Sequence, residues 1–239
     1  MSPTLPRRLA AEGVGTALLV AIVVGSGIFA QRLSDDVGLQ LLENSIATGA
    51  GLVALILAFG SVSGAHFNPV VTLADRLLGG LSTREAAGYV AAQVAGGLVG
   101  TVVANLMFDL DAIDWSTRQR TGGDLWLGEV VATFGLLIVI LGVVRAKRTD
   151  VVAFAVGGYI AAAYWFTSST SFANPAVTIA RTATDTFTGI APADAPAFIV
   201  AQVIGALGAA ALAAYLFTDL DPTDVVVPHP TDHQEHPTP

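Results

Sequence analysis

Two stretches of the chain decide its fold. They are Ser63–Leu73, which reads SGAHFNPVVTL, and Thr170–Ile179, which reads TSFANPAVTI. Each has an irregular polar lead-in, then Asn-Pro, then one or two turns of apolar helix. Asn caps helix N-termini and Pro suits the first helical position, so Asn68 and Asn174 each predict a helix start. Both helices are too short to cross a bilayer, and a capped helix in an ordinary extramembrane loop is the alternative for either stretch alone.

The composition around these stretches is that of a membrane protein. Of 239 residues, 53% are hydrophobic and 13% are charged, and the mean hydropathy is +0.66, whereas soluble domains carry about 25% charged residues. The net charge of -8 argues against a nucleic-acid partner. The chain has no cysteine, which excludes disulfides and thiolate metal sites. The composition therefore indicates a protein of the lipid bilayer.

Six apolar segments are long enough to cross a bilayer, which needs about 20 residues. The predicted spans are 9–30, 38–62, 86–108, 125–144, 151–166 and 195–217. Small residues, such as the Gly96-Gly97 pair, recur within them and permit close helix packing in lipid. The spans therefore predict a tightly packed helical bundle.

The three-span pattern occurs twice. Glu12 lies near the start of the first span and Glu129 near the start of the fourth, in similar sequence contexts. The two Asn-Pro stretches follow the second and fifth spans, and the motif AQV recurs at Gln93 and Gln202. Since three is odd, the second copy must be inverted, and inverted repeats bring broken helices together near the bilayer midplane.

This repeat gives the predicted organisation of the whole chain. It comprises an N-terminal segment 1–8, a first repeat 9–108, an external loop 109–124, a second repeat 125–217 and an acidic tail 218–239. The tail is rich in Pro, Asp and His and predicts disorder. Its histidines, His229, His233 and His236, are expected to be solvated rather than to bind a metal.

Lys and Arg are distributed unevenly between the two sides of the bundle. With the N-terminus inside, seven lie on the cytoplasmic side, namely Arg7, Arg8, Arg76, Arg84, Arg145, Lys147 and Arg148. Four lie on the outer side, namely Arg32, Arg118, Arg120 and Arg181. Cytoplasmic loops carry the excess of basic residues. The chain is therefore predicted to be a multi-pass protein of the cell membrane with both termini in the cytoplasm.

Two half-helix N-termini that face one point would favour uncharged solutes there. Each contributes about half a positive charge and several unpaired backbone N–H groups. Asn68 and Asn174 would use their side-chain oxygens as caps and leave their NH2 groups free to donate. A narrow path with apolar walls and a few donors suits small neutral molecules with hydroxyl groups and opposes cations.

Four other polar residues invite a functional interpretation. Glu12 and Glu129 either accept backbone N–H groups from the re-entrant loops or relay protons. His66 either lines the lumen near the cytoplasmic mouth or ties down its loop. Arg181 and Asp185 have the spacing of an i,i+4 pair and are expected to form a hydrated ion pair in the vestibule. The spans hold no nucleophile–base pair or metal-ligand cluster, so neither a catalytic site nor a cofactor is expected.

At residues 8–217 the chain resembles the major intrinsic protein family, the aquaporins and aquaglyceroporins. Asn68, Pro69 and Val70 resemble the first signature of that family, with Val in place of the usual Ala. The second signature, Asn174-Pro175-Ala176, is intact. The resemblance implies an all-α aquaporin-like bundle of six transmembrane helices and two re-entrant half-helices, with one pore per subunit in a homotetramer.

The chain departs from the family at the constriction. Most members have an arginine directly after the second signature, and here the residue is Val177. By comparison with the family, the other constriction positions are Thr48, Ser171 and Ala162, with Ile160 as a rival on the fifth span. These residues predict a small, mostly neutral ring without a bulky aromatic residue.

Replacement of this arginine by Val resembles the bacterial branch of the family that is associated with arsenic resistance. The resemblance implies a passive channel for arsenite as neutral arsenous acid, with possible passage of glycerol and water. A general glycerol, urea and water facilitator without a metalloid role is the nearest alternative. A coupled secondary transporter is the second, because inverted repeats with broken helices occur there too.

Overall fold

The helices form where hydropathy and the two Asn-Pro pairs predict them. The computed structural model describes residues 3–217, and within these residues six helices are long and apolar enough to cross a membrane. They are α1 (Leu5–Leu33), α2 (Val37–Ser63), α4 (Thr83–Met107), α5 (Gly123–Arg145), α6 (Val152–Phe166, preceded by the 3-10 turn η1, Thr149–Val151) and α8 (Ala195–Leu216). The predicted tail, 218–239, lies outside the described residues.

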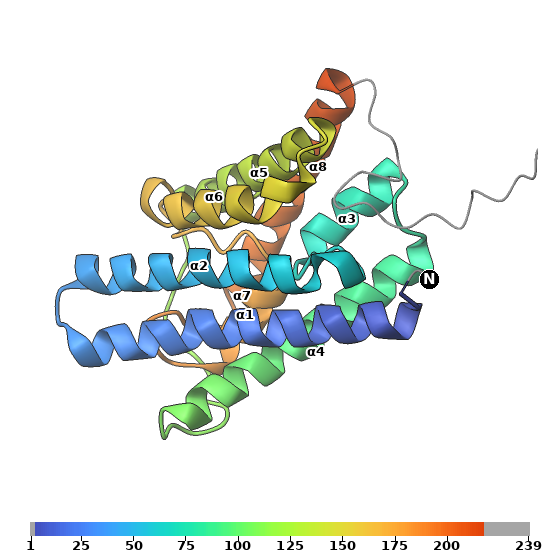
Figure 1. Cartoon of the computed structure of the whole chain (residues 1–239). Coiled ribbons are helices and arrows are strands. Elements are labelled where there is room, and N and C mark those ends of the chain that lie inside the picture. Colours follow the sequence, from blue (N-terminus) through green and yellow to red (C-terminus); the bar gives the residue numbers. More distant parts are fainter. Residues whose placement is uncertain (1–2, 218–239) are drawn as a thin grey trace, which may run out of the picture.

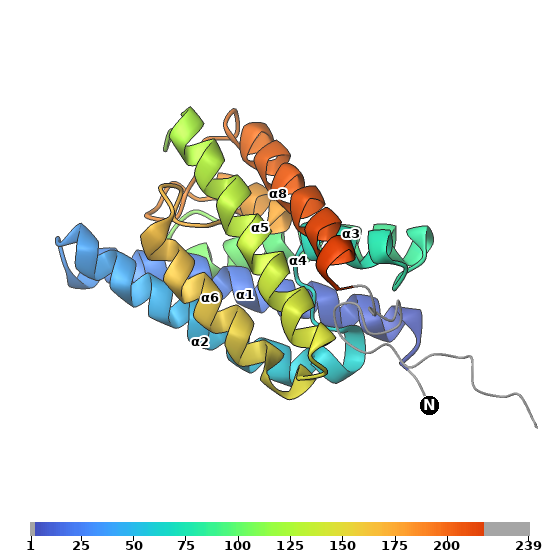
Figure 2. The same ribbon diagram turned by 90° about the horizontal axis from the view of Figure 1, so that it is seen from above.

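The two short helices lie between the long ones. They are α3 (Pro69–Leu78) and α7 (Pro175–Ala180), and α7 runs into the 3-10 turn η2 (Arg181–Ala183). Figure 1 shows α1 and α2 side by side, with α4 crossing behind α1. The view in Figure 2 shows α5, α6 and α8 as a second group packed over the first. Each group supplies one of the two half-helices.

Glycines make the closest helix contacts possible, and they do so at equivalent places in the two groups. A Cβ atom on Gly96 of α4 would overlap the carbonyl oxygen of Gly13 on α1. A Cβ atom on Gly205 of α8 would lie 2.5 Å from the carbonyl oxygen of Val130 on α5. In lipid, where apolar side chains gain little by meeting one another, such close backbone packing holds helices together.

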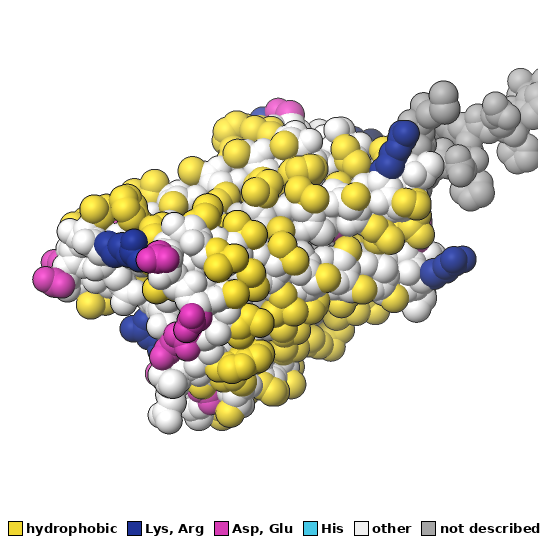
Figure 3. All heavy atoms as spheres, turned by 90° about the horizontal axis from the view of Figure 1, so that it is seen from below, with side chains coloured by type: hydrophobic (Ala, Val, Ile, Leu, Met, Phe, Trp, Pro, Cys, Tyr) yellow, Lys and Arg dark blue, Asp and Glu magenta, His cyan; other side chains and the backbone are white. Residues whose placement is uncertain are grey.

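The surface of the bundle matches a bilayer. Large apolar side chains are exposed on the flanks of the spans, among them Val14, Leu57, Phe154 and Val200. Figure 3 shows one face on which hydrophobic side chains cover the middle while acidic and basic side chains gather toward the ends. An apolar belt of this extent is stable only against lipid or another apolar surface. The chain is a multi-pass membrane protein.

The loop between α4 and α5 folds back over the C-terminal end of α7. The backbone N–H groups of Asp114 and Ser116 donate to the carbonyl oxygens of Ala183 and Thr182, at 3.1 and 2.9 Å. Asp185 accepts from both the backbone N–H and the hydroxyl of Thr117, each at 2.9 Å. The loop therefore fixes the segment that follows the second half-helix.

Candidate functional site

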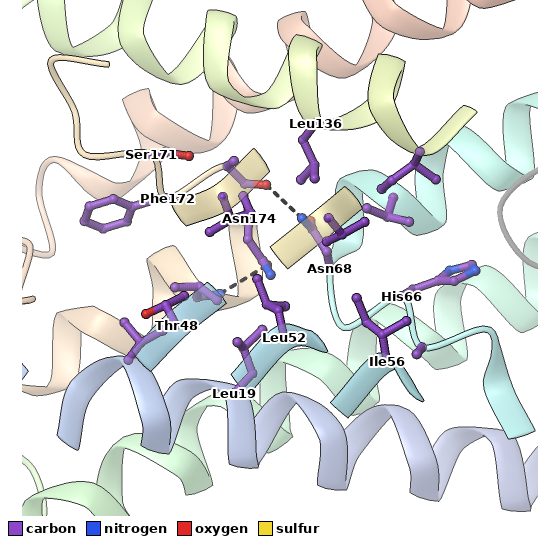
Figure 4. A pocket seen from close by; sticks show the side chains of 18 of the residues that line it. Leu19, Thr48, Leu52, Ile56, His66, Asn68, Leu136, Ser171, Phe172 and Asn174 are labelled. Carbon is purple, nitrogen blue, oxygen red and sulfur yellow. Dashed lines mark hydrogen bonds between the residues drawn. The ribbon is translucent and has the colours of Figure 1, made fainter. Parts of the chain in front are cut away.

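The two capping asparagines meet in the middle of the bundle. The side-chain amide of Asn68 donates to the carbonyl oxygen of Ala173, and that of Asn174 donates to the carbonyl oxygen of Phe67, both at 2.8 Å. Figure 4 shows the two asparagine side chains close to each other in the cavity. The expectation that both NH2 groups are wholly free is thus wrong, because each amide spends one hydrogen on the opposite loop. Since an amide has two N–H bonds, one donor per asparagine remains.

The same asparagines start the half-helices. The side-chain oxygen of Asn68 accepts from the backbone N–H of Val70 at 3.0 Å. That of Asn174 accepts from the backbone N–H groups of Ala176 at 3.0 Å and Val177 at 3.3 Å. Both caps are therefore formed as the sequence predicts.

The lead-ins to the half-helices have a strained backbone. Ala65, Phe67, Ser171 and Ala173 have φ values between 47° and 52°, in the left-handed region that non-glycine residues seldom adopt. Such a conformation persists only where the surroundings over-determine it. The surrounding groups that hold it in place are the two buried glutamates.

Glu12 and Glu129 act as acceptors for these lead-ins. Glu12 accepts from the backbone N–H groups of His66 at 3.0 Å and Phe67 at 2.8 Å. Glu129 accepts from those of Phe172 at 2.9 Å and Ala173 at 2.8 Å. Of the two interpretations left open, the structure therefore supports the structural one.

A glutamine and a threonine complete each arrangement. Gln93 donates to Glu12 at 2.8 Å, and Gln202 donates to Glu129 at 2.7 Å. Each glutamine also donates to a threonine hydroxyl on a half-helix, Thr72 at 3.0 Å and Thr178 at 2.8 Å. The sequence analysis assigned no role to either glutamine, although the repeated AQV motif could have pointed to both.

A cavity of about 760 Å³, a volume that includes adjoining open solvent, is lined by both asparagines. In Figure 4, Thr48, Ser171 and Phe172 lie on one side of the pair, and His66 and Ile56 lie on the other. Most of the wall is apolar, formed by side chains such as Leu19, Leu52, Ile56, Val71, Leu136, Ile140, Val156 and Ile160. The polar lining residues are Thr48, His66, Asn68, Tyr164, Ser171, Asn174 and Arg181. The arrangement is that of a pore.

The residues of the predicted constriction are only partly in this wall. Thr48, Ser171 and Val177 line the cavity, whereas Ala162 lies on the exposed face of α6. Ile160, the alternative position on this span, does line the cavity, and so does Tyr164, one helical turn later. The choice of Ala162 is therefore wrong, because α6 is apolar on all sides and its sequence gives no rotational register.

The other four signature residues are buried and do not line the cavity. Pro69, Val70, Pro175 and Ala176 form the first turns of α3 and α7 and are absent from the cavity wall. Their contribution is to shape and pack the half-helices, which leaves the two asparagines as the signature residues exposed to the lumen.

The α7 end of the cavity is not the small neutral ring that the sequence predicts. Tyr164 and Phe172 line it, and the Tyr164 hydroxyl lies 3.1 Å from the Thr48 hydroxyl. Arg181 lines it too, 3% exposed, with its guanidinium carbon 3.3 Å from the centre of the Phe172 ring. Aromatic bulk and a positive charge are therefore both present at this end.

The predicted ion pair between Arg181 and Asp185 does not form. Nε of Arg181 donates to the carbonyl oxygen of Thr188, and Asp185 is bound to Thr117. The i,i+4 rule holds only within an α-helix, and α7 ends at Ala180. Asp185 therefore lies beyond the helical turn that would have brought it to the arginine.

At the α3 end of the cavity, His66 both lines the lumen and ties down its loop, the two roles that the sequence left open. Its ring lines the cavity, and its Nδ1 lies 3.0 Å from the Thr72 hydroxyl. Its Nε2 lies 3.3 Å from a carboxylate oxygen of Asp75 on α3, and both side chains are buried. Asp75 was not singled out from sequence, because nothing in its spacing relates it to His66.

Comparisons with known proteins agree with this geometry. Residues 1–167 and 145–236 match the family described as major intrinsic protein. A relative described as aquaglyceroporin AqpS, from Rhizobium meliloti, is 54% identical over 91% of this chain and 93% of its own. A probable aquaporin AqpM from Archaeoglobus fulgidus is 29% identical over 90% of this chain and 99% of its own.

A solved structure supports the fold. The X-ray structure of the aquaglyceroporin from Plasmodium falciparum superimposes with a TM-score of 0.72 and 21% identity, covering 92% of this chain and 99% of that one. With six spans, two abutting half-helices and matches of this extent, the chain belongs to the major intrinsic protein family, whose members are membrane channels rather than enzymes.

Proposed function

We propose that the chain is a passive channel for small neutral solutes, arsenous acid among them, with glycerol and water as further solutes. The observation that carries this proposal is Val177 in the pore wall, where most of the family has arginine. Its short apolar side chain leaves room that a guanidinium would fill. The similarity to a relative named an aquaglyceroporin supports a pore wide enough for more than water.

The geometry explains why neutral solutes would be favoured. A solute beside the asparagine pair meets apolar walls, the remaining amide N–H groups and the positive ends of two helix dipoles. A neutral molecule with hydroxyl groups replaces lost water contacts by accepting from these donors. A cation receives no compensation for its hydration shell and is repelled by the dipoles.

The saturated glutamates argue for passive transport. A coupled transporter needs an ion or proton site in the membrane. Glu12 and Glu129 are fully buried, and each accepts several hydrogen bonds from its own re-entrant loop and glutamine. Their structural use supports a channel that carries solute only down its gradient.

The solute is tested in proteoliposomes that contain the purified chain. We expect arsenous acid and glycerol each to enter faster than in protein-free vesicles, in proportion to concentration and without a proton or sodium gradient. Rapid glycerol entry with background arsenous acid entry would favour the general facilitator. Entry that saturates and requires an ion gradient would favour a coupled transporter.

The assembly and orientation are part of the same proposal. A homotetramer in the cell membrane with cytoplasmic termini follows from the resemblance and from the basic cluster Arg145, Lys147 and Arg148. The α7 end of the pore is then external and His66 faces the cytoplasm. Crosslinking in native membranes, and protease access to tagged termini in oriented vesicles, test the two points separately.

A further inference from the structure

Arg181 has hydrogen-bond donors that no protein group uses. Its Nε donates to the carbonyl oxygen of Thr188, but the hydrogen bonds of residues 3–217 give its two terminal amino groups no acceptor. The residue is 97% buried, yet it lines the cavity. A buried guanidinium whose amino groups are unpaired is costly unless something else accepts from it. The lumen is the place where an acceptor can come from.

The guanidinium is held in position rather than mobile. Its stacking on Phe172, at 3.3 Å, and the bond to Thr188 fix both its plane and its direction. Arg120 also lies against Phe172, with its guanidinium carbon 5.0 Å from the ring centre, and donates to the carbonyl oxygen of Gly189 at 2.8 Å. No carboxylate of the described residues forms an ion pair with Arg181. Its positive charge therefore has no ion-pair partner among residues 3–217.

Hydroxyl groups at the same end of the cavity complement these donors. The Tyr164 hydroxyl, bonded to Thr48, lines the same cavity as Arg181. The Ser171 hydroxyl is buried in the wall, and residues 3–217 offer it no hydrogen-bond partner. This end of the pore thus offers fixed N–H donors together with hydroxyls that can donate or accept.

We propose that Arg181 supplies the donors and the positive charge of the outer filter, one helical turn after the position that Val177 occupies. The filter is then displaced along α7 rather than lost. The solutes that it fits are small neutral molecules with two or more hydroxyl groups. This inference rests on the proposed channel function, but it does not depend on which neutral solute passes.

The displacement also explains why Val177 is uncharged. Arg181 is the C-cap of α7, and its backbone N–H donates to the carbonyl oxygen of Val177, so it follows Val177 by one helical turn and both residues line the cavity. An arginine at 177 would bring a second guanidinium beside the first, with like charges in a poorly solvated wall. The uncharged Val177 avoids this repulsion.

The test compares Arg181→Met and Arg181→Lys with the control Arg118→Met. Arg118 is exposed on the same side of the protein, stacks on Phe187 at 5.6 Å and is outside the cavity wall. Arg118→Met removes the same charge without touching the lumen. Glycerol and water permeability and sodium leak are measured in the same proteoliposomes.

We expect Arg181→Met to lower the glycerol-to-water permeability ratio about tenfold, the effect of losing hydrogen bonds to a charged donor, and to admit sodium. Arg181→Lys should keep sodium out but still lower the ratio, because an ammonium lacks the planar fork. Arg118→Met should change neither. A ratio within about twofold of wild type and a sodium-tight pore in Arg181→Met would overturn the proposal.

Two further readouts keep the test decisive. If Arg181→Met fails to fold, as judged by lost water permeability, an unchanged ratio in Arg181→Lys overturns the proposal by itself. Wild-type vesicles that pass glycerol but not arsenous acid would refute the proposed solute and leave the role of Arg181 to these variants.

The swap Val177→Arg/Arg181→Val should regain glycerol flux that Val177→Arg alone loses. Additive losses would contradict a shared filter.

Discussion

At the scale of single residues, the pore depends on two side chains that each make two kinds of contact. The oxygen of Asn68 caps its own half-helix while its amide reaches the opposite loop, and Asn174 does the same in reverse. A carboxamide accepts at its oxygen and donates at its nitrogen with no net charge. The sequence predicted the caps and their meeting, but not the reciprocal bonds, because Asn-Pro spacing carries no information about the far side of the lumen.

Replacement of Asn174 by Asp tests this dual role. The carboxylate could still cap α7, but it would lose the 2.8 Å bond to Phe67 and place a negative charge against that carbonyl. We expect glycerol flux to fall at least about tenfold, and cations to leak. Stopped-flow light scattering and a sodium-sensitive dye measure the two effects.

Asn44→Asp is the matched control. Asn44 is also buried and its amide also donates to a carbonyl oxygen, that of Val23 at 2.9 Å, but it lies outside the cavity wall. The control should lower stability without admitting cations. A leak in the control equal to that in Asn174→Asp would show that the effect comes from buried charge in general.

Val177→Arg tests the width of the filter. The larger side chain should slow glycerol and arsenous acid more than water, since it fills space in the wall and repels Arg181. Permeability to the three solutes in one vesicle preparation gives the comparison. Equal fluxes in variant and wild type would mean that Val177 does not limit the pore.

At the scale of elements, the half-helices depend on acceptors that lie on other helices. Glu12 on α1 and Glu129 on α5 hold lead-ins whose backbone is strained. The repeated Glu gave this arrangement as one of two interpretations, the other being a proton relay. The register of α6 and the early end of α7 were not predictable, because α6 has no polar side to orient it and nothing in the local sequence stops α7 after six residues. For this reason Tyr164 was missed and Arg181 was given the wrong partner.

Glu129→Gln probes the lead-in of α7. A glutamine has one acceptor oxygen and sets an NH2 group against backbone N–H donors, at a cost of about 2–4 kcal/mol in folding free energy. We expect a lower thermal unfolding temperature in detergent and a loss of flux. Glu43→Gln, which changes a carboxylate that is outside the cavity wall, is the control. Unchanged stability would contradict the anchoring role of Glu129.

The contact of the α4–α5 loop with Asp185 should depend on pH. Hydrogen bonds from Thr117 hold the pKa of Asp185 below its usual value. Because the folded pKa is the lower one, the contact stabilises the loop above the unfolded pKa and is lost as the pH falls through the folded value. Protection from hydrogen exchange at 114–118, taken relative to the intrinsic exchange rate at each pH, should fall as the pH drops below about 4, the ordinary pKa of Asp. In Asp185→Asn the exchange should be fast throughout; a wild-type profile there would exclude Asp185 as the cause.

At the scale of the whole molecule, two groups of three helices enclose one passage. The six spans, their order and the family were all predictable, because hydropathy and a duplicated signature act over the whole chain. The chemistry of the pore wall was less predictable, because it depends on which side chains from six α-helices, the turn η2 and two re-entrant loops reach one cavity. The sequence therefore predicted a channel with a neutral ring, whereas the structure has an arginine in its wall.

The most direct test of this account is the rate at which arsenous acid and sodium enter vesicles that contain the wild-type chain. The asparagine pair favours uncharged molecules. Arsenous acid should therefore enter well above the protein-free rate, with no imposed ion gradient, while the rate of sodium entry stays at background. Arsenous acid entry equal to that of empty vesicles, or sodium entry that rises with it, would contradict the account.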